Sequence, residues 1–322
     1  MTLWYRFVTW LWTQEIGTPL AVFRILFGLT LLWDLIDIGL SGALEMLWLP
    51  EPIGYRMPSP RKLMGFETPT SVSGILWGYG ITVTAVTALS VGVGARGAAF
   101  LSLLGTQYLL SLNTSAFGGH DRVFTNGLFL LIFARSDETL SLSCWLRNRQ
   151  WTSIQPVPAW PRYLMVYQLV MIYVFTGVQK LGAVWWPMGE LLAVHYALLL
   201  PHYARGDWWW VAWLSPLTKA ASLITVVWEM TWWVVLLWFW LNRTADRGGR
   251  LRRLAERFDL RLLYILIGVG MHGTVWLMMN LGPFSAVTLS FYAVLFRHDE
   301  FLAGWQRLRR VINRAPAAPR SG

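Results

Sequence analysis

The chain has 322 residues, of which 55% are hydrophobic and only 14% are charged, and its mean hydropathy is +0.45. A soluble domain of this length carries about 25% charged residues, so the composition excludes an ordinary soluble fold. The net charge of +10 lies in loops and tails between apolar runs, which argues against a nucleic-acid partner and for contact with anionic lipid headgroups.

Long apolar runs predict an all-α, polytopic transmembrane helix bundle, because backbone groups in a bilayer must be hydrogen-bonded within their own segment. We expect three regions: an interfacial amphipathic segment at residues 1–18, the bundle at residues 19–297 and a basic cytoplasmic tail at residues 298–322. The connector at residues 182–217 holds an interfacial DWWW cluster and is expected to contain a surface or re-entrant helix. About eight spans are expected, at residues 19–40, 72–93, 97–112, 123–134, 163–181, 220–241, 260–280 and 284–296.

Arginines between the apolar runs indicate which ends of the spans face the cytoplasm. Seven lie between Arg243 and Arg261, and six lie in the tail from Arg297 onward. By the positive-inside rule both regions are cytoplasmic, and counting spans backward places both termini there. The first loop is discordant, because its three basic residues at positions 56–62 then lie outside.

Ionisable side chains gather near the outer ends of the spans in this topology. His120 lies in an outer loop, Lys180 at the outer end of its span and His272 in the outer half of another. Asp34 and Asp37 lie in the outer half of the first span. Charged groups are costly in a bilayer and usually face a bundle interior or a watery cavity. We therefore expect a pocket that opens on the extracytoplasmic side.

Other titratable residues are less informative. His195 and His202 share the connector with Glu190, but their spacings fit no standard zinc motif, so no metal site is predicted. Glu229 stands in the middle of the apolar segment TVVWEMTWWVVLLW. A carboxylate there must pair with a cation or be protonated.

A motif around the fifth expected span is more specific. Within YLMVYQLVMIYVFTGVQKLGAVWWPMGELL, Gly177 and Lys180 belong to a Gly-x-x-Lys-Leu pattern that follows a Tyr-rich stretch and precedes a Trp and a Gly. This segment resembles the HTTM (horizontally transferred transmembrane) family and its relative, the vitamin K-dependent gamma-glutamyl carboxylase. The segments around His120 and His272 are similar to the histidine-containing segments of those families. The resemblance covers residues 15–300.

The resemblance implies roles for particular residues. In the carboxylase, the lysine matching Lys180 is the proposed base that deprotonates a reduced naphthoquinone, and the histidine matching His120 assists. We therefore take Lys180, His120 and His272 as candidate catalytic residues, and a reduced naphthoquinone as the candidate cofactor. The candidate cofactor-binding residues are Tyr173, Gly177, Trp185, Trp186 and Glu229.

The residues themselves are compatible with a base at Lys180. A lysine that acts as a base near neutral pH needs a pKa below its ordinary value of about 10.4, and apolar surroundings provide this. Lysine is also rare here, since only Lys62, Lys180 and Lys219 occur in a chain that otherwise uses arginine, which keeps its proton. The alternative is that Lys180 extends to the lipid headgroups and performs no chemistry.

Three functions stay open on the sequence alone. The first is an enzyme that uses a reduced quinone, although Gln179 replaces a second lysine of the carboxylase and a short tail replaces its lumenal domain, which argues against protein carboxylation. The second is a non-catalytic membrane protein that binds a lipid, a quinone or a protein partner. The third is a proton-linked transporter using Asp34, Glu229 and His272, which the lack of an internal repeat disfavours. We expect a bacterial cytoplasmic membrane as the location and membrane lipids as partners.

Overall fold

The structure, a computed structural model, describes residues 2–54 and 70–314, and helices dominate it. This confirms the predicted all-α class, whereas the discordant basic residues of the first loop lie outside the described part. The α-helices are α1 (Leu3–Leu11), α2 (Thr18–Leu40), α3 (Ala43–Trp48), α4 (Val72–Val91), α5 (Ala95–Leu112), α6 (Gly119–Phe133), α7 (Leu142–Asn148), α8 (Trp160–Gln179), α9 (Ala193–Leu199), α10 (Ser215–Met230), α11 (Trp233–Arg243), α12 (Arg250–Arg257), α13 (Leu260–Met278), α14 (Phe284–Ser290) and α15 (His298–Arg314). The 3-10 helices are η1 (Thr114–Ala116), η2 (Ala183–Trp185), η3 (Pro187–Gly189), η4 (Trp209–Leu214), η5 (Ala245–Arg247) and η6 (Phe291–Leu295).

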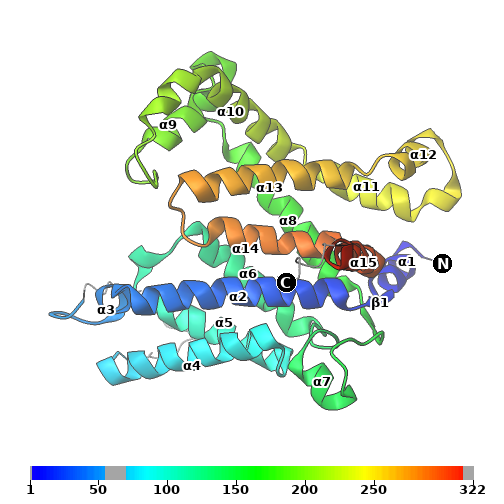
Figure 1. The fold of residues 1–322 in the computed structure, drawn as a ribbon, viewed down its shortest axis with the longest axis horizontal. Coiled ribbons are helices and arrows are strands. Elements are labelled where there is room, and N and C mark those ends of the chain that lie inside the picture. The colour runs from blue at the N-terminus through cyan, green and yellow to red at the C-terminus, as the bar shows by residue number, and fades with distance from the viewer. Residues whose placement is uncertain (1, 55–69, 315–322) are drawn as a thin grey trace, which may run out of the picture.

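Helix α2 lies in the middle of a layer of helices that run along the long axis of the molecule (Figure 1). It packs against α4 on one side and against α14 and η6 on the other, and α13 continues the layer beyond α14. Helix α8 crosses this layer and contacts η6, α10 and α11. Helices α8, α10 and α13, which carry Tyr173, Glu229 and His272, thus belong to one half of the bundle.

Aromatic rings form the core around α2. Phe23 and Phe27 lie 4.7 and 6.0 Å from Phe291 between ring centroids, and Phe27 lies 5.5 Å from Phe124 of α6. Edge-on pairs at these distances are favourable beyond the area that they bury. Gly127 of α6 leaves room for Phe27, because a Cβ there would lie 2.4 Å from the ring. This contact fixes α6 against α2.

Four helical segments are long and apolar enough to cross a bilayer: α2, α4, α13 and the continuous segment Trp209–Met230 formed by η4 and α10. The chain is thus an integral membrane protein. Helix α5 packs on α4 and helix α8 packs on α10, but both are less apolar. The expected count of eight spans and the orientation of the termini stay predictions.

The sixth expected span is interrupted, which corrects the prediction of one continuous helix. Helix α10 ends at Met230 and α11 begins at Trp233. The hydroxyl of Thr231 donates to a carbonyl of the preceding turn at 2.6 Å, a contact that bends helices. The backbone carbonyl of Thr231 accepts a hydrogen bond from Tyr264 at 3.2 Å, and the side chain of Trp232 is fully buried. Non-helical backbone is tolerated at membrane depth where the protein satisfies it in this way.

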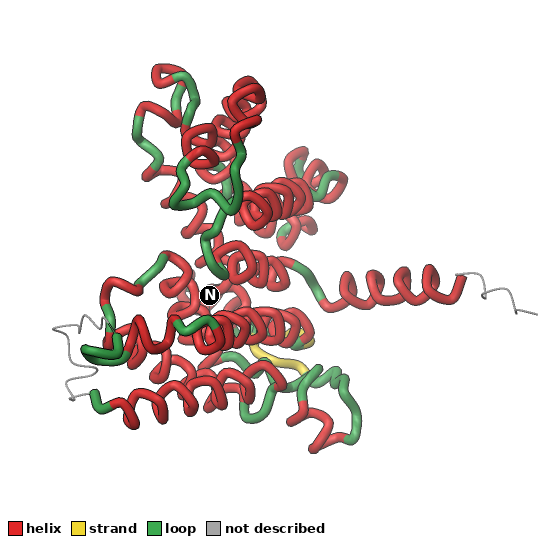
Figure 2. Tube along the Cα trace, turned by 60° about the vertical axis from the view of Figure 1, so that its left-hand side comes forward, coloured by secondary structure: helices red, strands yellow, loops and turns green. Residues whose placement is uncertain are grey.

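The two ends of the bundle differ in charge. Helices α1, α7 and α12 and the start of α15 lie together at one end, whereas α3 and the turn between α13 and α14 lie at the other (Figure 1). The first end contains the arginines of residues 243–257 and Arg297, and we term it the arginine-rich end. Helix α15 leaves this end sideways, away from the bundle (Figure 2). The arginines of residues 243–257 and Arg297, which the positive-inside rule assigns to one side, therefore share one end of the structure.

Two short strands that the sequence analysis did not predict stand at the arginine-rich end. Strand β1 (Gln14–Ile16) pairs antiparallel with β2 (Pro156–Pro158), with Glu15 opposite Val157. The pairing ties the segment before α2 to the segment before α8. Strands this short give little periodicity, and their partners are far apart in the chain.

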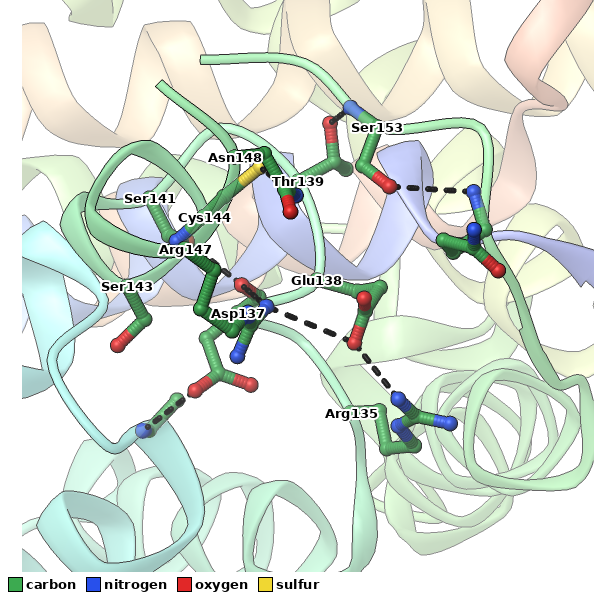
Figure 3. A network of polar contacts seen from close by, with 12 residues as sticks. Arg135, Asp137, Glu138, Thr139, Ser141, Ser143, Cys144, Arg147, Asn148 and Ser153 are labelled. Atoms are coloured by element: carbon green, nitrogen blue, oxygen red, sulfur yellow. Dashed lines mark hydrogen bonds and ion pairs between the residues drawn. The ribbon is translucent and has the colours of Figure 1, made fainter. Parts of the chain in front are cut away.

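Polar contacts hold the loop between α6 and β2 at the same end (Figure 3). Glu138 accepts a hydrogen bond from Arg135 at 2.8 Å and lies 3.6 Å from Arg147. Asp137 accepts a hydrogen bond from the backbone amide of Ala95 at 3.3 Å, so the loop also caps the start of α5. These contacts, together with the short helix α7, give the segment a fixed shape.

The guanidinium of Arg24 extends this network into the bundle. Arg24 is fully buried in α2, and it donates to the backbone carbonyls of Ser136 at 2.5 Å and of Leu140 at 2.6 Å. A buried charge is costly unless such acceptors surround it. The loop therefore supplies the hydrogen-bond acceptors for this arginine, and these contacts stabilise both α2 and the loop.

Candidate functional site

The ammonium of Lys180 folds back onto the carboxylate of Glu229. Lys180 is the residue directly after α8 and Glu229 is near the end of α10, so the ion pair joins two helices. The two side chains are 18% and 8% exposed. The Nζ atom also lies 3.4 Å from the carbonyl oxygen of Thr176 and 5.1 Å from the ring centroid of Trp185. Removing one partner of such a secluded pair leaves an uncompensated charge.

The helix crossing that creates this pair depends on Gly177. A Cβ at this position would lie 2.8 Å from the backbone nitrogen of Met230 and 2.9 Å from the Cβ of Glu229. Such distances are too short for any other residue unless the backbone of α10 moves. Gly177 therefore sets the close approach of α8 and α10 one turn before Lys180.

A second set of polar groups lies one turn earlier on α8. The hydroxyl of Tyr173 lies 2.8 Å from Nε2 of His272 on α13 and 2.8 Å from the hydroxyl of Tyr292 in η6. All three side chains are buried. Tyr173 also stacks on Trp232, with ring centroids 4.6 Å apart and planes at 21°.

Helical spacing places these groups in a line. Tyr173, Gly177 and Lys180 are separated by four and three residues, so they share one face of α8. We term the set Lys180, Glu229, Tyr173, His272 and Tyr292 the buried polar row. Nδ1 of His272 is buried and has no hydrogen-bond partner among the described residues.

The structure places His120 apart from this row. It lies at the start of α6, where Nε2 is 3.7 Å from the carboxylate of Asp121 and the ring packs edge-on against Phe124. Within the described residues, no hydrogen bond or ion pair joins it to Lys180 or His272. The turn between α13 and α14 is the link between the two histidines: Gly282 lies next to His120, and the ring of Phe284 lies 5.8 Å from that of His272.

Trp185 and Trp186 lie next to Lys180. Trp185 faces the ammonium, and Nε1 of Trp186 donates to the backbone carbonyl of Lys180 at 2.9 Å. Both indoles are half-buried, and the neighbouring Leu181 is 73% exposed. We term these two indoles beside Lys180 the aromatic rim.

Several members of this region were not predicted as site residues. Tyr292 supplies a hydroxyl to the row, and Trp228 and Trp232 enclose Tyr173. The sequence signal for Tyr292 is a phenol in the middle of an apolar segment, which needs a hydrogen-bond partner when it is buried. Gly177 is a packing residue in this geometry, and its assignment to cofactor binding, like the other predicted roles, stays a prediction.

Comparison with known proteins identifies a family whose domain includes most of these residues. A sequence model of the HTTM domain matches residues 14–244, which include Tyr173, Gly177, Lys180 and Glu229, whereas His272 and Tyr292 lie beyond the match. No solved structure matches the chain. Since the match covers most of the sequence, the chain belongs to the HTTM family.

Proposed function

We propose that this protein is a membrane enzyme in which the Lys180–Glu229 pair takes a proton from a weakly acidic, lipid-soluble substrate. The observation that carries the proposal is the secluded contact between a lysine and a carboxylate beside an aromatic rim. Proton transfer from Nζ to the carboxylate would leave a neutral amine and a neutral acid. Because the apolar surroundings penalise charge, this neutral form is favoured there more than in water.

The neutral amine can then act as the base. It takes the proton of the substrate hydroxyl, which restores the ammonium and leaves the substrate as an anion beside it, while Glu229 keeps the first proton. The total charge of the pair and the substrate is zero before and after the transfer. A base of this kind works best when its pKa is near the ambient pH.

A reduced naphthoquinone is the substrate that the resemblance implies, and the residues around Lys180 are compatible with it. Such a molecule supplies a weakly acidic phenolic hydroxyl on a flat ring. The indoles of Trp185 and Trp186 lie beside Lys180, where they could stack on such a ring, and the side chain of Lys180 is partly exposed. Tyr173 and His272 hold α8 against α13 and so position the amine. We place this site toward the extracytoplasmic side of a bacterial cytoplasmic membrane, following the positive-inside rule.

The test measures oxidation of a reduced naphthoquinone to its epoxide under oxygen by the purified protein in lipid nanodiscs. The comparison is between Lys180→Ala and Lys219→Ala, because Lys219 pairs with the exposed Glu190 and lies outside the buried polar row. We expect epoxide from the wild type and Lys219→Ala, and none from Lys180→Ala. Equal activity in both variants would remove Lys180 from the chemistry. Saturable quinone binding without turnover would instead favour the non-catalytic function, and Glu229-dependent proton flux into vesicles would favour the transporter.

A further inference from the structure

A cavity of about 850 Å³ lies at the arginine-rich end, between α1, β1, α8, α11 and the start of α15. Its size is typical of a site for an organic ligand. Arg162 and Tyr163, from the first turn of α8, belong to its wall, whereas Lys180 follows the last turn of that helix. The cavity is therefore separate from the buried polar row, and the proposed function does not use it.

The wall of this cavity changes from charged to apolar along both long helices that form it. On α8, Arg162 is followed one turn deeper by Val166, and on α11, Arg243 is preceded by Phe239 and Leu236. Helix α8 begins at the arginine-rich end and α11 ends there, so the two gradients have the same direction. A phospholipid has this polarity profile, with an anionic headgroup at one end and acyl chains at the other.

The two arginines on the long helices of the cavity, Arg162 and Arg243, differ in whether a carboxylate neutralises them. Arg162 is neutralised by Glu15, to which its Nε and NH2 donate at 2.7 Å each, and its third nitrogen donates to the carbonyl of Val294. Arg243 has no carboxylate partner among the described residues. Its guanidinium donates to the hydroxyl of Tyr163 at 2.6 Å and to that of Thr13 at 3.0 Å. Neutral groups thus hold an uncompensated positive charge in a fixed position.

Aromatic rings add to this fixed position of Arg243. Its guanidinium carbon lies 5.7 Å from the ring centroid of Trp10 and 5.6 Å from that of Tyr163, and these two rings are stacked on each other. A pre-organised guanidinium loses little entropy when it binds a phosphate. Arg297, which is exposed, adds a second cation to the charged rim of the cavity. Two carboxylates line the cavity, Glu15, which pairs with Arg162, and Asp299.

The neighbouring helix α15 indicates that this rim lies at the level of lipid headgroups. Leu302, Trp305, Leu308 and Ile312 recur at helical spacing and are all exposed. Arg307, Arg309 and Arg310 stand between them in the second half of the helix. A helix of this type lies in the membrane interface, with its apolar face toward the acyl chains. Helix α15 projects sideways from the bundle, as an interfacial helix would (Figure 2).

We infer that this cavity binds one anionic glycerophospholipid, whose phosphate contacts Arg243 and Arg297 and whose acyl chains lie against Leu236 and Phe239. The charge of the cavity rim, the polarity gradient of its wall and the adjacent interfacial helix all match such a lipid. Lipid binding here does not depend on the proposed function, because no residue of the buried polar row takes part.

Native mass spectrometry of the delipidated, full-length protein in detergent tests this inference. We expect one phosphatidylglycerol to bind, about tenfold more tightly than phosphatidylcholine, as one charge-assisted hydrogen bond implies. Arg243→Gln should weaken phosphatidylglycerol binding by a similar factor. Arg253→Gln is the matched control, because Arg253 is an exposed arginine of α12 at the same end but outside the cavity. Equal effects of both variants would show general attraction to anionic lipid and would overturn the inference.

A second variant and a competitor without acyl chains complete the test of lipid binding. Arg297→Gln removes an exposed side chain that makes no hydrogen bond to the described residues, so it reports on the rim even where Arg243→Gln fails to fold. We expect a loss of affinity for phosphatidylglycerol there as well, and an unchanged affinity would contradict the inference. Glycerol 3-phosphate serves as a competitor without acyl chains. Complete displacement of the lipid at equal concentration would show that the cavity binds a phosphate alone and would overturn the lipid assignment.

Discussion

Gly177 and Glu229 face each other where α8 crosses α10: a methyl group at Gly177 would lie 2.9 Å from the Cβ of Glu229. This crossing brings the carboxylate within reach of Lys180, one turn further along α8. The ion pair thus depends on a glycine that carries no chemistry of its own. The same crossing thus determines both the packing of the helices and the position of the ion pair. Variants of Gly177 and of Glu229 test these two roles separately.

Gly177→Ala should destabilise the protein by about 1–3 kcal/mol, as overpacking of a close contact does. The added Cβ would lie 2.8 Å from the backbone nitrogen of Met230, which cannot rotate away. Thermal unfolding in detergent measures the effect. Gly270→Ala is the control, because no atom lies within 4 Å of a Cβ there. Equal losses in both variants would refute the packing role of Gly177.

Glu229→Gln should cost about 3 kcal/mol of stability, because it leaves the ammonium of Lys180 without its partner in a secluded position. The same variant removes the proposed proton acceptor, so any epoxidation should cease. Glu190→Gln is the matched control: it breaks the pair with Lys219, but Glu190 is 71% exposed, and exposed pairs contribute little. A double-mutant cycle with Lys180→Met measures the coupling directly, and a coupling energy near zero would mean that the pair does not form.

Tyr173→Phe should destabilise the protein by about 1–3 kcal/mol, because it removes the hydroxyl that contacts both His272 and Tyr292. Tyr292→Phe breaks only one of these hydrogen bonds, so its effect should be smaller. Chemical unfolding of the two single variants and the double variant gives the comparison. Additive effects would contradict a connected chain of hydrogen bonds.

Acidification should destabilise the arginine-rich end through Glu300. Burial alone raises the pKa of Glu300, but hydrogen bonds from Arg261 and from the backbone amide of Arg297 outweigh it and hold the pKa below its usual value of 4.5. A carboxyl with a lowered folded-state pKa contributes stability above its ordinary pKa, and the contribution disappears as the pH falls through the folded-state pKa. Unfolding of the wild type between pH 6 and pH 3 should therefore show a loss that Glu300→Gln lacks. Identical pH profiles would exclude this role.

The sequence was sufficient to predict most of the long helices. Apolar runs of spanning length predicted α2, α4 and α13, and the Gly-x-x-Lys pattern led to Lys180 before its surroundings were known. The interruption at Thr231 was missed, because the Trp-rich stretch around it contains neither glycine nor proline. A bend caused by a threonine hydroxyl and stabilised by Tyr264 depends on a neighbouring helix that local patterns do not include.

The partners of each residue in the candidate site could not be predicted from the sequence. The family pattern singled out Tyr173, Gly177 and Lys180, but it did not indicate which carboxylate would meet the lysine. The expected gathering of histidines separated into two groups, because His120 faces Asp121 whereas His272 faces Tyr173. Which helices adjoin one another determines such partners, and this information is not contained in the period of any single segment.

The contact of Arg24 with the loop after α6 has a consequence for the order of events during synthesis. The arginine and its acceptor at Ser136 are 112 residues apart in the chain. At a translation rate of about 5–20 residues per second, α2 leaves the ribosome roughly 6–20 s before its acceptors exist. During that interval the guanidinium of Arg24 requires water or headgroup oxygens. We therefore expect α2 to reach its final position only after the loop has been made, so that the first half of the bundle is completed late.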